Sequence, residues 1–191
     1  AFVAVMAALA ASSVLMLATK DPELLAERSA FHKNTKAWDK ALAPMVALIG
    51  PAATWVVAGL DERYAWSRPI PTSVYAAGFV LIVLGSAVIL WAMMSNRFFS
   101  TVVRIQDDRG HSVACAGPYQ YVRHPGYVGM IAYFLGTPLA LGSWYALVPA
   151  LLTIGATVLR TSLEDKTLLA ELPGYREYAA RMRYRLLPGT W

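Results

Sequence analysis

A short segment just before a long uncharged run carries ionisable and aromatic side chains in close succession. Residues 117–129 read Gly-Pro-Tyr-Gln-Tyr-Val-Arg-His-Pro-Gly-Tyr-Val-Gly. Gly117-Pro118 indicates a turn. Pro125 can open a helix, because the N–H that proline lacks is not needed in the first helical turn. Arg123 and His124 therefore precede a helix start, where they either anchor the helix in the headgroup layer or belong to a functional site.

A second charged cluster follows the uncharged run. Arg160 and Glu164 are four residues apart, so they share one helix face, where they either pair with each other or face a ligand. If the uncharged run 127–159 folds as a helical hairpin, the two charged clusters converge at one depth of the membrane. Ionisable groups gathered at such a depth indicate a functional site.

The elements that position these clusters are predicted to be membrane helices. Only 15% of the 191 residues are charged and 57% are hydrophobic, whereas soluble proteins carry about 25% charged residues. A helix crosses the hydrocarbon core with about 20 apolar residues. The prediction is an all-α integral membrane protein of about five transmembrane helices: Ala1–Ala18, Leu42–Leu60 with a kink at Pro51, Val74–Met94, and two short hairpin helices within 127–159, separated near Gly136, Pro138, Gly142 and Ser143. The opening run has no basic segment before it, so we expect a signal anchor or an ordinary membrane helix.

The distribution of basic residues predicts the orientation. Lys and Arg are frequent in residues 19–41, in 95–126 and from 160 onward, sparse in 61–73 and absent from the hairpin tip. This alternation predicts that the two charged clusters and the C-terminus face the cytoplasm. The tail is expected to be helical in two pieces, broken at Pro173-Gly174. The net charge of +5 reflects this placement and does not indicate nucleic acid. Cys115, the sole cysteine, indicates neither a disulfide nor a metal site.

The two clusters also carry a family resemblance. The pattern Gly-Pro-Tyr-x-x-x-Arg-His-Pro-x-Tyr-x-Gly, then a span pair, Arg160-x-x-x-Glu164-Asp165 and Gly174-Tyr175-x-x-Tyr178 resembles the isoprenylcysteine carboxyl methyltransferase family, which is related to membrane phospholipid methyltransferases. The resemblance covers about residues 95–191. It implies that 95–191 binds S-adenosyl-L-methionine at the cytoplasmic face, whereas the three spans expected in 1–94 rest on their apolar runs alone.

The resemblance also implies a set of site residues. Glu164 would hold the cationic amine of the cofactor, Arg123 or His124 its carboxylate, and Tyr119 and Tyr127 its adenine or sulfonium. Arg104 stands where eukaryotic members carry a glutamine, and Arg160 falls where the family binds substrate. The implied cofactor-binding set is Arg104, His111, Ser112, Val113, Ala114, Tyr119, Arg123, His124, Pro125, Gly126, Tyr127 and Glu164, with no metal ligand.

The expected function is methyl transfer to a lipophilic acceptor that enters from the bilayer. The leading version is methyl esterification of a prenylated cysteine, a reaction that needs positioning but no general base. N-methylation of a phospholipid amine is the alternative within the same class, and Glu164 or His124 could accept its proton. A small transporter or a non-catalytic scaffold is the alternative of a different class, and it differs in not retaining the cofactor.

Overall fold

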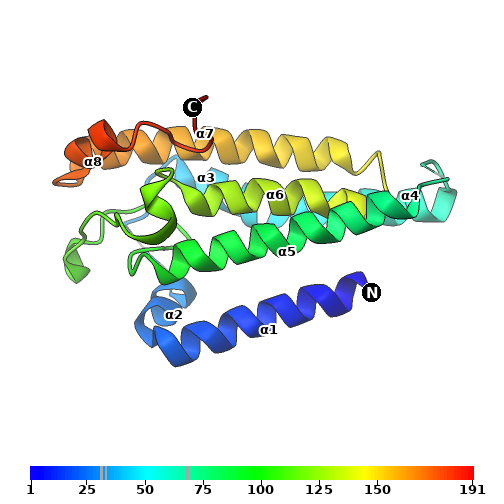
Figure 1. Ribbon diagram of the computed structural model, residues 1–191, viewed down its shortest axis with the longest axis horizontal. Coiled ribbons are helices and arrows are strands. Elements are labelled where there is room, and N and C mark those ends of the chain that lie inside the picture. Colours follow the sequence, from blue (N-terminus) through cyan, green and yellow to red (C-terminus); the bar gives the residue numbers. More distant parts are fainter. Residues whose placement is uncertain (31, 33, 68) are drawn as a thin grey trace.

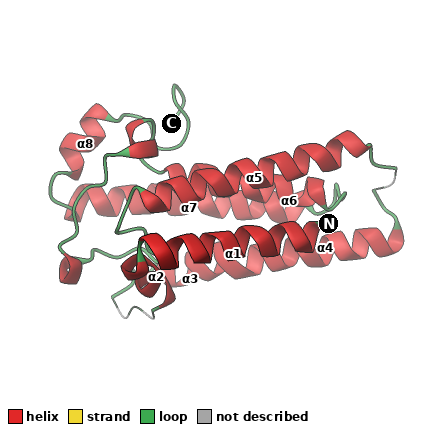
Figure 2. Cartoon of the chain, turned by 60° about the horizontal axis from the view of Figure 1, so that its bottom comes forward, coloured by secondary structure: helices red, strands yellow, loops and turns green. Residues whose placement is uncertain are grey.

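The chain is a bundle of long, roughly antiparallel helices with short helices gathered at one end (Figures 1 and 2). The computed structural model describes residues 1–30, 32, 34–67 and 69–191. Lys33 and Arg68, two of the basic residues in the topology argument, lie outside the described residues. The described chain contains helices and no strand, as predicted: α1 (Phe2–Lys20), α2 (Pro22–Ser29), α3 (Asp39–Pro44), η1 (Met45–Ile49), α4 (Gly50–Tyr64), α5 (Thr72–Met94), η2 (Asp107–Arg109), η3 (Gly117–Gln120), α6 (Pro125–Ala140), α7 (Leu147–Glu171) and α8 (Tyr175–Arg181).

Four stretches of the described chain are long and apolar enough to cross a membrane. They are Phe2–Lys20, Asp39–Tyr64, Thr72–Met94 and Leu147–Glu171. They include the first three predicted spans and the second hairpin helix. The first hairpin helix, α6, has 16 residues and is about 24 Å long at the usual rise. A fifth crossing by α6 remains a prediction.

The second hairpin helix is longer than the sequence suggested. We expected two short hairpin helices and a helical tail broken at Pro173-Gly174, but α7 runs 25 residues without interruption up to that break. No glycine or proline lies between Gly155 and Pro173, so the helical hydrogen bonds continue through the charged cluster. The chain breaks only at Pro173-Gly174, where Gly174 adopts a φ of +80°. Arg160 and Glu164 are therefore fixed on the same rigid helix that enters the bundle.

Glycines hold α6 tightly against α5. A Cβ atom added at Gly85 would lie 2.6 Å from the carbonyl oxygen of Gly129, and one added at Gly129 would lie 2.6 Å from the carbonyl oxygen of Gly85. Such distances leave no room for a side chain, and small residues of this kind let membrane helices approach backbone to backbone. The contact fixes the start of α6, which carries the residues that follow His124.

The second span contains a π-helical turn. Met45–Ile49 is π-helical and lies between α3 and α4, directly before the Gly50-Pro51 start of α4. Pro51 was expected to disturb this helix, because proline offers no N–H and its ring crowds the preceding turn. π-Helical turns are rare, occur mostly as single turns inside α-helices, and are frequent at functional sites.

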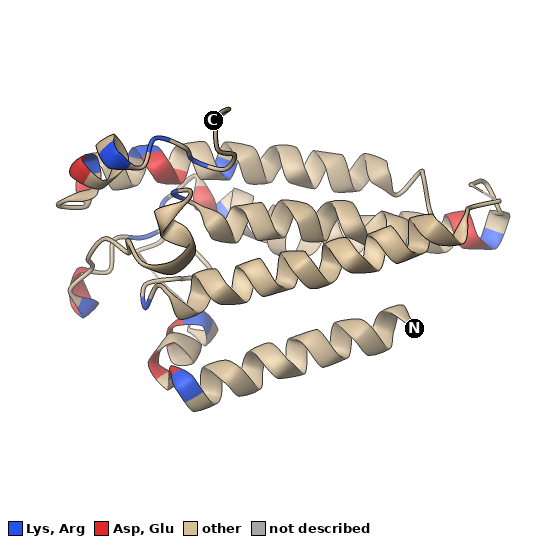
Figure 3. Cartoon of the chain, in the orientation of Figure 1, with Lys and Arg blue, Asp and Glu red and all other residues tan. Residues whose placement is uncertain are grey.

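Charged residues gather at one end of the bundle (Figure 3). That end holds α2, α8 and the charged half of α7. The middle of the bundle is almost free of charge, and a smaller charged group lies at the far end of α4, the end that contains Asp61. This distribution fits a protein whose apolar middle lies in hydrocarbon.

Candidate functional site

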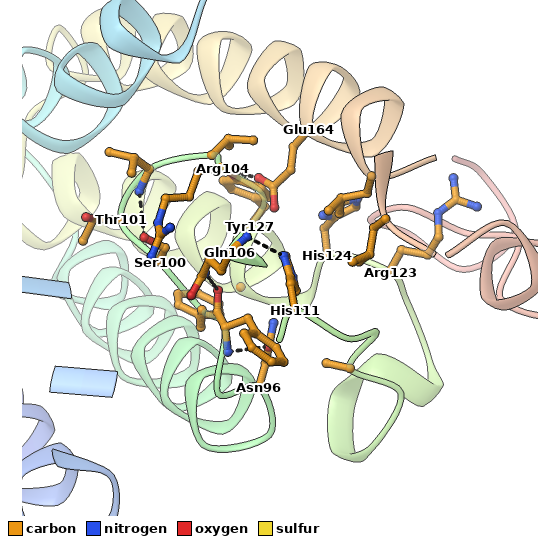
Figure 4. A pocket seen from close by; sticks show the side chains of 18 of the residues that line it. Asn96, Ser100, Thr101, Arg104, Gln106, His111, Arg123, His124, Tyr127 and Glu164 are labelled. Atoms are coloured by element: carbon orange, nitrogen blue, oxygen red, sulfur yellow. Dashed lines mark hydrogen bonds between the residues drawn. The ribbon is translucent and has the colours of Figure 1, made fainter. Parts of the chain in front are cut away.

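The charged end of the bundle encloses a cavity of about 210 Å³. Its wall is built from α2, η1, the loop after α5, η3, the first turns of α6, the middle of α7, and α8 (Figure 4). Of the residues implied by the family resemblance, all but Pro125 line this cavity. Pro125 is buried at the start of α6, where it shapes the helix start, as its position in the sequence suggested.

Glu164 is the acidic side chain that faces the cavity from α7. The hydroxyl of Tyr127 donates a hydrogen bond of 2.5 Å to its Oε2 atom, and the two side chains converge in Figure 4. No cation of the described chain forms an ion pair with this carboxylate. The alternative of an internal Arg160–Glu164 pair is therefore not what the structure contains.

Arg160 is paired with a residue that the sequence did not single out. Its Nε and Nη2 atoms donate to the two carboxylate oxygens of Asp39 at 2.6 and 3.0 Å. Nη2 also donates to the carbonyl oxygen of Thr101 at 2.9 Å. Asp39 is fully buried, so its charge requires this partner. Arg160 still lines the cavity, and no hydrogen bond of its Nη1 atom occurs within the described chain.

Asp165, the neighbour of Glu164, does not line the cavity and is surrounded by hydrogen-bond donors. Arg123 Nη2 lies 3.0 Å from Oδ2 and His124 Nε2 lies 3.2 Å from Oδ1. The Tyr175 hydroxyl donates to Oδ1 at 2.9 Å, and Arg185 Nε donates to Oδ2 at 2.8 Å. These contacts join α6, α7 and the tail through one buried carboxylate. The adjacent acidic residues of α7 thus lie in different environments: Glu164 faces the cavity, and Asp165 is buried among hydrogen-bond donors.

Arg123 also binds the end of the tail helix. Its Nη1 atom donates to the carbonyl oxygens of Met182 and Arg183 at 3.1 and 3.4 Å, where a cation is favourable near the C-terminus of a helix. Its main-chain N–H donates to the carbonyl oxygen of Tyr184 at 2.9 Å. In Figure 4 the guanidinium points away from the centre of the cavity. The observed partners of Arg123 and His124 are therefore within the protein, and their expected role in binding the cofactor carboxylate stays a prediction.

The tail helix α8 forms one side of the cavity through Tyr175 and Tyr178. The hydroxyl of Tyr178 donates to the carbonyl oxygen of Tyr119 at 2.7 Å. Tyr119, Tyr175, Tyr178 and Leu172 pack into one buried cluster with Ala92. Three tyrosine rings thereby gather beside Glu164 and Tyr127, and the wall on this side is aromatic.

The loop after α5 forms the opposite, more polar wall. Arg104 donates to Glu27 at 2.9 Å and to Asp108 at 2.8 Å. Burial alone would raise the pKa of Glu27, but hydrogen bonds from Arg104 and Ser100 outweigh burial and lower it. The positive charge of Arg104 is thus paired with two carboxylates, those of Glu27 and Asp108.

The histidine expected in this loop is neutral at physiological pH. Burial, together with the nearby charge of Arg104, lowers the pKa of His111 to about 4. The main-chain N–H of Gln106 lies 3.2 Å from its Nδ1 atom. His111 can therefore offer a hydrogen bond to a ligand without adding positive charge to the cavity.

Several wall residues had no signal in the sequence reasoning. Gln106 is buried in this loop, two residues after Arg104, and its Nε2 atom donates to the carbonyl oxygen of Phe98 at 2.8 Å. Tyr175 and Tyr178 were noted in the tail, but nothing in a single sequence showed that the tail folds back. Arg28 and Asn96 also line the cavity. Arg28 precedes the region in which the motifs occur, so motif matching could not find it.

A second cavity lies within the apolar part of the bundle. Its volume is about 360 Å³, and its wall comes from α1, η1, α4, α5 and α6. Three residues, Val46, Ala47 and Met130, line both cavities. Two of them belong to the π-helical turn. The polar cavity at the charged end is therefore adjoined by an apolar one at the depth of the membrane spans.

The fold and the site define a helical membrane protein with a polar cavity at one end of an apolar bundle. The phospholipid methyltransferase family model matches residues 73–173, which include α5, α6, α7 and the loop between α5 and α6. The match covers more than half of the chain, and the chain belongs to this family.

The curated relatives carry a related name. A probable protein-S-isoprenylcysteine O-methyltransferase of Oryza sativa subsp. indica is 27% identical over 108 residues, 55% of this chain and 56% of that protein. Protein-S-isoprenylcysteine O-methyltransferase of Schizosaccharomyces pombe is 38% identical over 52 residues, 27% of this chain and 22% of that protein. Protein-S-isoprenylcysteine O-methyltransferase B of Arabidopsis thaliana is 31% identical over 65 residues, 34% of this chain and 33% of that protein. The predicted family resemblance is confirmed, and the chain spans about half or less of the length of these relatives.

Proposed function

We propose that this protein is a membrane methyltransferase that uses S-adenosyl-L-methionine, with methyl esterification of a prenylated cysteine or a similar lipophilic carboxylate as its leading reaction. The observation that carries the proposal is the cavity at the charged end, where Glu164 lacks a cationic partner within the described chain and tyrosines surround it. Such a cavity suits a ligand that carries positive charge. The names of the curated relatives support the same chemistry.

The wall residues fit the proposed cofactor. Glu164 would accept a charge-assisted hydrogen bond from its amine. Tyr119 and Tyr127 offer aromatic faces that attract a cation or stack on a flat base. His111 adds no competing positive charge. Bound there, the cofactor would supply an electrophilic methyl group whose transfer to a carboxylate oxygen requires no proton acceptor.

The adjoining apolar cavity supports a lipophilic acceptor. A chain lying between α1, η1 and α6 would be in hydrocarbon contact, while its polar end would reach the cofactor cavity past Val46, Ala47 and Met130. The side chains that both cavities share are apolar, so passage of a hydrocarbon chain costs no buried polar contact.

Arg160 is proposed to orient the acceptor carboxylate through its Nη1 atom. Asp39 holds the Nε and Nη2 atoms and so fixes the plane of the guanidinium. A fixed planar group can hold a carboxylate in one orientation. Shielding by the tail and this orientation are what methyl transfer requires of the protein.

N-methylation of a phospholipid amine is the second candidate, because the matching family model bears that name. That reaction releases a proton. Glu164 faces the cavity as a carboxylate that can accept it, whereas His124 is engaged by Asp165 and the Tyr175 hydroxyl. A transporter or scaffold remains the candidate of another class.

Two measurements on the purified chain test the proposal. Titration calorimetry should detect binding of S-adenosylmethionine and of its demethylated product, which a transporter or scaffold has no reason to retain. Transfer of a labelled methyl group to a panel of farnesylated cysteines and phospholipids should then identify the acceptor. A folded preparation that binds neither form of the cofactor overturns the enzyme proposal. The charged end, and with it the C-terminus, is proposed to face the cytoplasm, since basic loops remain on that side.

A further inference from the structure

One arginine on the cavity wall differs from the others in its partners. Arg104, Arg123 and Arg160 each form an ion pair with at least one carboxylate. Arg28, the basic residue in the last turn of α2, lines the same cavity but forms no ion pair within the described chain. The three positions outside it carry phenylalanine, lysine and arginine, so none of them could supply a carboxylate.

Arg28 is held in place without being neutralised. Its Nη1 atom donates to the carbonyl oxygen of Phe99 at 3.3 Å, and its guanidinium carbon lies 5.3 Å from the centre of the Phe99 ring. Burial lowers the pKa of Arg28, with no acid offsetting the effect. A charged group that is partly desolvated and has no carboxylate within ion-pair distance is stabilised when an anion binds to it. The cavity wall thus carries one positive and one negative side chain, Arg28 and Glu164, that have no ion-pair partner within the described chain.

The position of Arg28 assigns it to the acceptor side of the cavity. Phe99 packs against Gly126 at the start of α6, where a Cβ atom would lie 2.6 Å from its ring. One helical turn further along α6 is Met130, which lines both cavities. Helix α2 follows the end of the first span at the charged end of the bundle (Figure 1), which is the depth of lipid headgroups. An acceptor with its chain in the apolar cavity would present its polar group at that depth.

We propose that Arg28 binds the anionic group of the lipophilic acceptor, the carboxylate of a prenylated cysteine or the phosphate of a phospholipid. The inference rests on the proposed function and extends it. Arg160 supplies orientation through one N–H while its charge is neutralised by Asp39, and Arg28 supplies the uncompensated charge. The two arginines come from opposite halves of the chain, α2 and α7.

Equilibrium binding tests the inference without requiring turnover. The probes are N-acetyl-S-farnesylcysteine and its methyl ester, which differ in one negative charge, and a phosphatidic acid with the corresponding diacylglycerol, which differ in the anionic phosphate. The wild-type protein should prefer the charged member of at least one pair by roughly 10- to 100-fold, the range of a hydrogen bond to a charged group. Arg28→Gln should abolish that preference, and Arg28→Lys should restore part of it. Lys20→Gln, at an exposed position at the end of α1, is the matched control and should change nothing.

Cofactor affinity separates this role from its rivals. If Arg28 binds the acceptor, Arg28→Gln leaves the Kd of S-adenosylmethionine within about twofold of wild type while the Kd of the anionic probe rises. A parallel loss of cofactor affinity would mean that Arg28 holds the cofactor instead, and would overturn the inference. Equal binding of charged and neutral probes by the wild-type protein would overturn it as well. Failure of the proposed function is distinguishable from failure of this inference, because the wild-type protein would then bind no cofactor.

Discussion

Replacing Glu164 by Gln should weaken cofactor binding while leaving the fold intact. The substitution removes the negative charge but keeps an oxygen at the same place, so the hydrogen bond from the Tyr127 hydroxyl can persist. Because no cation is paired with Glu164 within the described chain, the change leaves no positive charge unpartnered in the protein. The expected loss comes only from the ligand. A hydrogen bond between charged groups contributes about 1.5–3 kcal/mol, so the Kd of S-adenosylmethionine should rise about 10- to 100-fold.

Asp165→Asn is the matched control one residue away. Asp165 does not line the cavity, and its loss of charge leaves Arg123 and Arg185 without their carboxylate. Breaking a buried ion pair in this way costs about 3–5 kcal/mol of folding free energy. We expect the opposite pattern from the two variants: Glu164→Gln lowers affinity with little change in Tm, and Asp165→Asn lowers Tm with a smaller change in affinity.

Titration calorimetry and thermal unfolding of both variants in the same detergent provide the comparison. Equal loss of affinity at both positions, with both proteins folded, would show a general electrostatic effect instead of a specific contact. Native affinity in Glu164→Gln would remove this residue from the proposed binding set altogether.

Three further predictions concern other residues. Arg160→Lys keeps a positive charge beside Asp39 but loses the planar guanidinium. We therefore expect cofactor affinity to remain and methyl transfer to carboxylate acceptors to fall at least about tenfold; unchanged transfer would refute the proposed orientation. Burial holds the pKa of His111 at about 4, against an ordinary value of 6.5, so the unfolded chain binds more protons than the folded one between these pH values. The free energy of unfolding should therefore fall as the pH drops from about 6.5 to about 4. His111→Gln should flatten this decline in denaturant titrations, and an unchanged slope would contradict the assignment. Tags at the two termini should be accessible from opposite sides of sealed vesicles, since five crossings require it; same-side accessibility would mean that α6 and α7 do not both cross.

The sequence predicted the helices well because the signal is physical and local. Long uncharged runs allow few alternatives in hydrocarbon, and three spans lie where their apolar limits placed them. The break predicted at Pro173-Gly174 is confirmed, but the hairpin helix α7 is longer than expected because its charged cluster does not interrupt it. A helix needs a break in its hydrogen bonding to end, and Pro173-Gly174 supplies the first one.

The site was predictable only where a motif carried it. Glu164, Tyr119 and Tyr127 stand in recognisable patterns, and they line the cavity. Asp39 and Arg28 lie in the first half of the chain, in no pattern, and their importance comes from contacts across the fold. Arg160 pairs with Asp39, 121 positions earlier in the chain, which helical spacing could not reveal. Sequence spacing left a pair with Glu164 open as one alternative, and the structure pairs Arg160 with the buried Asp39 instead.

The uninterrupted course of α7 bears on how the protein sits in a bilayer. Its uncharged part, residues 147–159, is only about 20 Å long, and α6 is about 24 Å, whereas the hydrocarbon core is about 30 Å thick. The uncharged part of the hairpin is therefore shorter than the hydrocarbon core, a negative hydrophobic mismatch, although α7 as a whole is long enough to cross when its charged half is included. Either the lipids around it thin locally, or the buried Arg160–Asp39 pair lies inside the hydrocarbon boundary. Both outcomes carry a cost that grows with acyl-chain length. Reconstitution in lipids of increasing chain length should therefore lower the stability of this protein progressively, and thin membranes should suit it best.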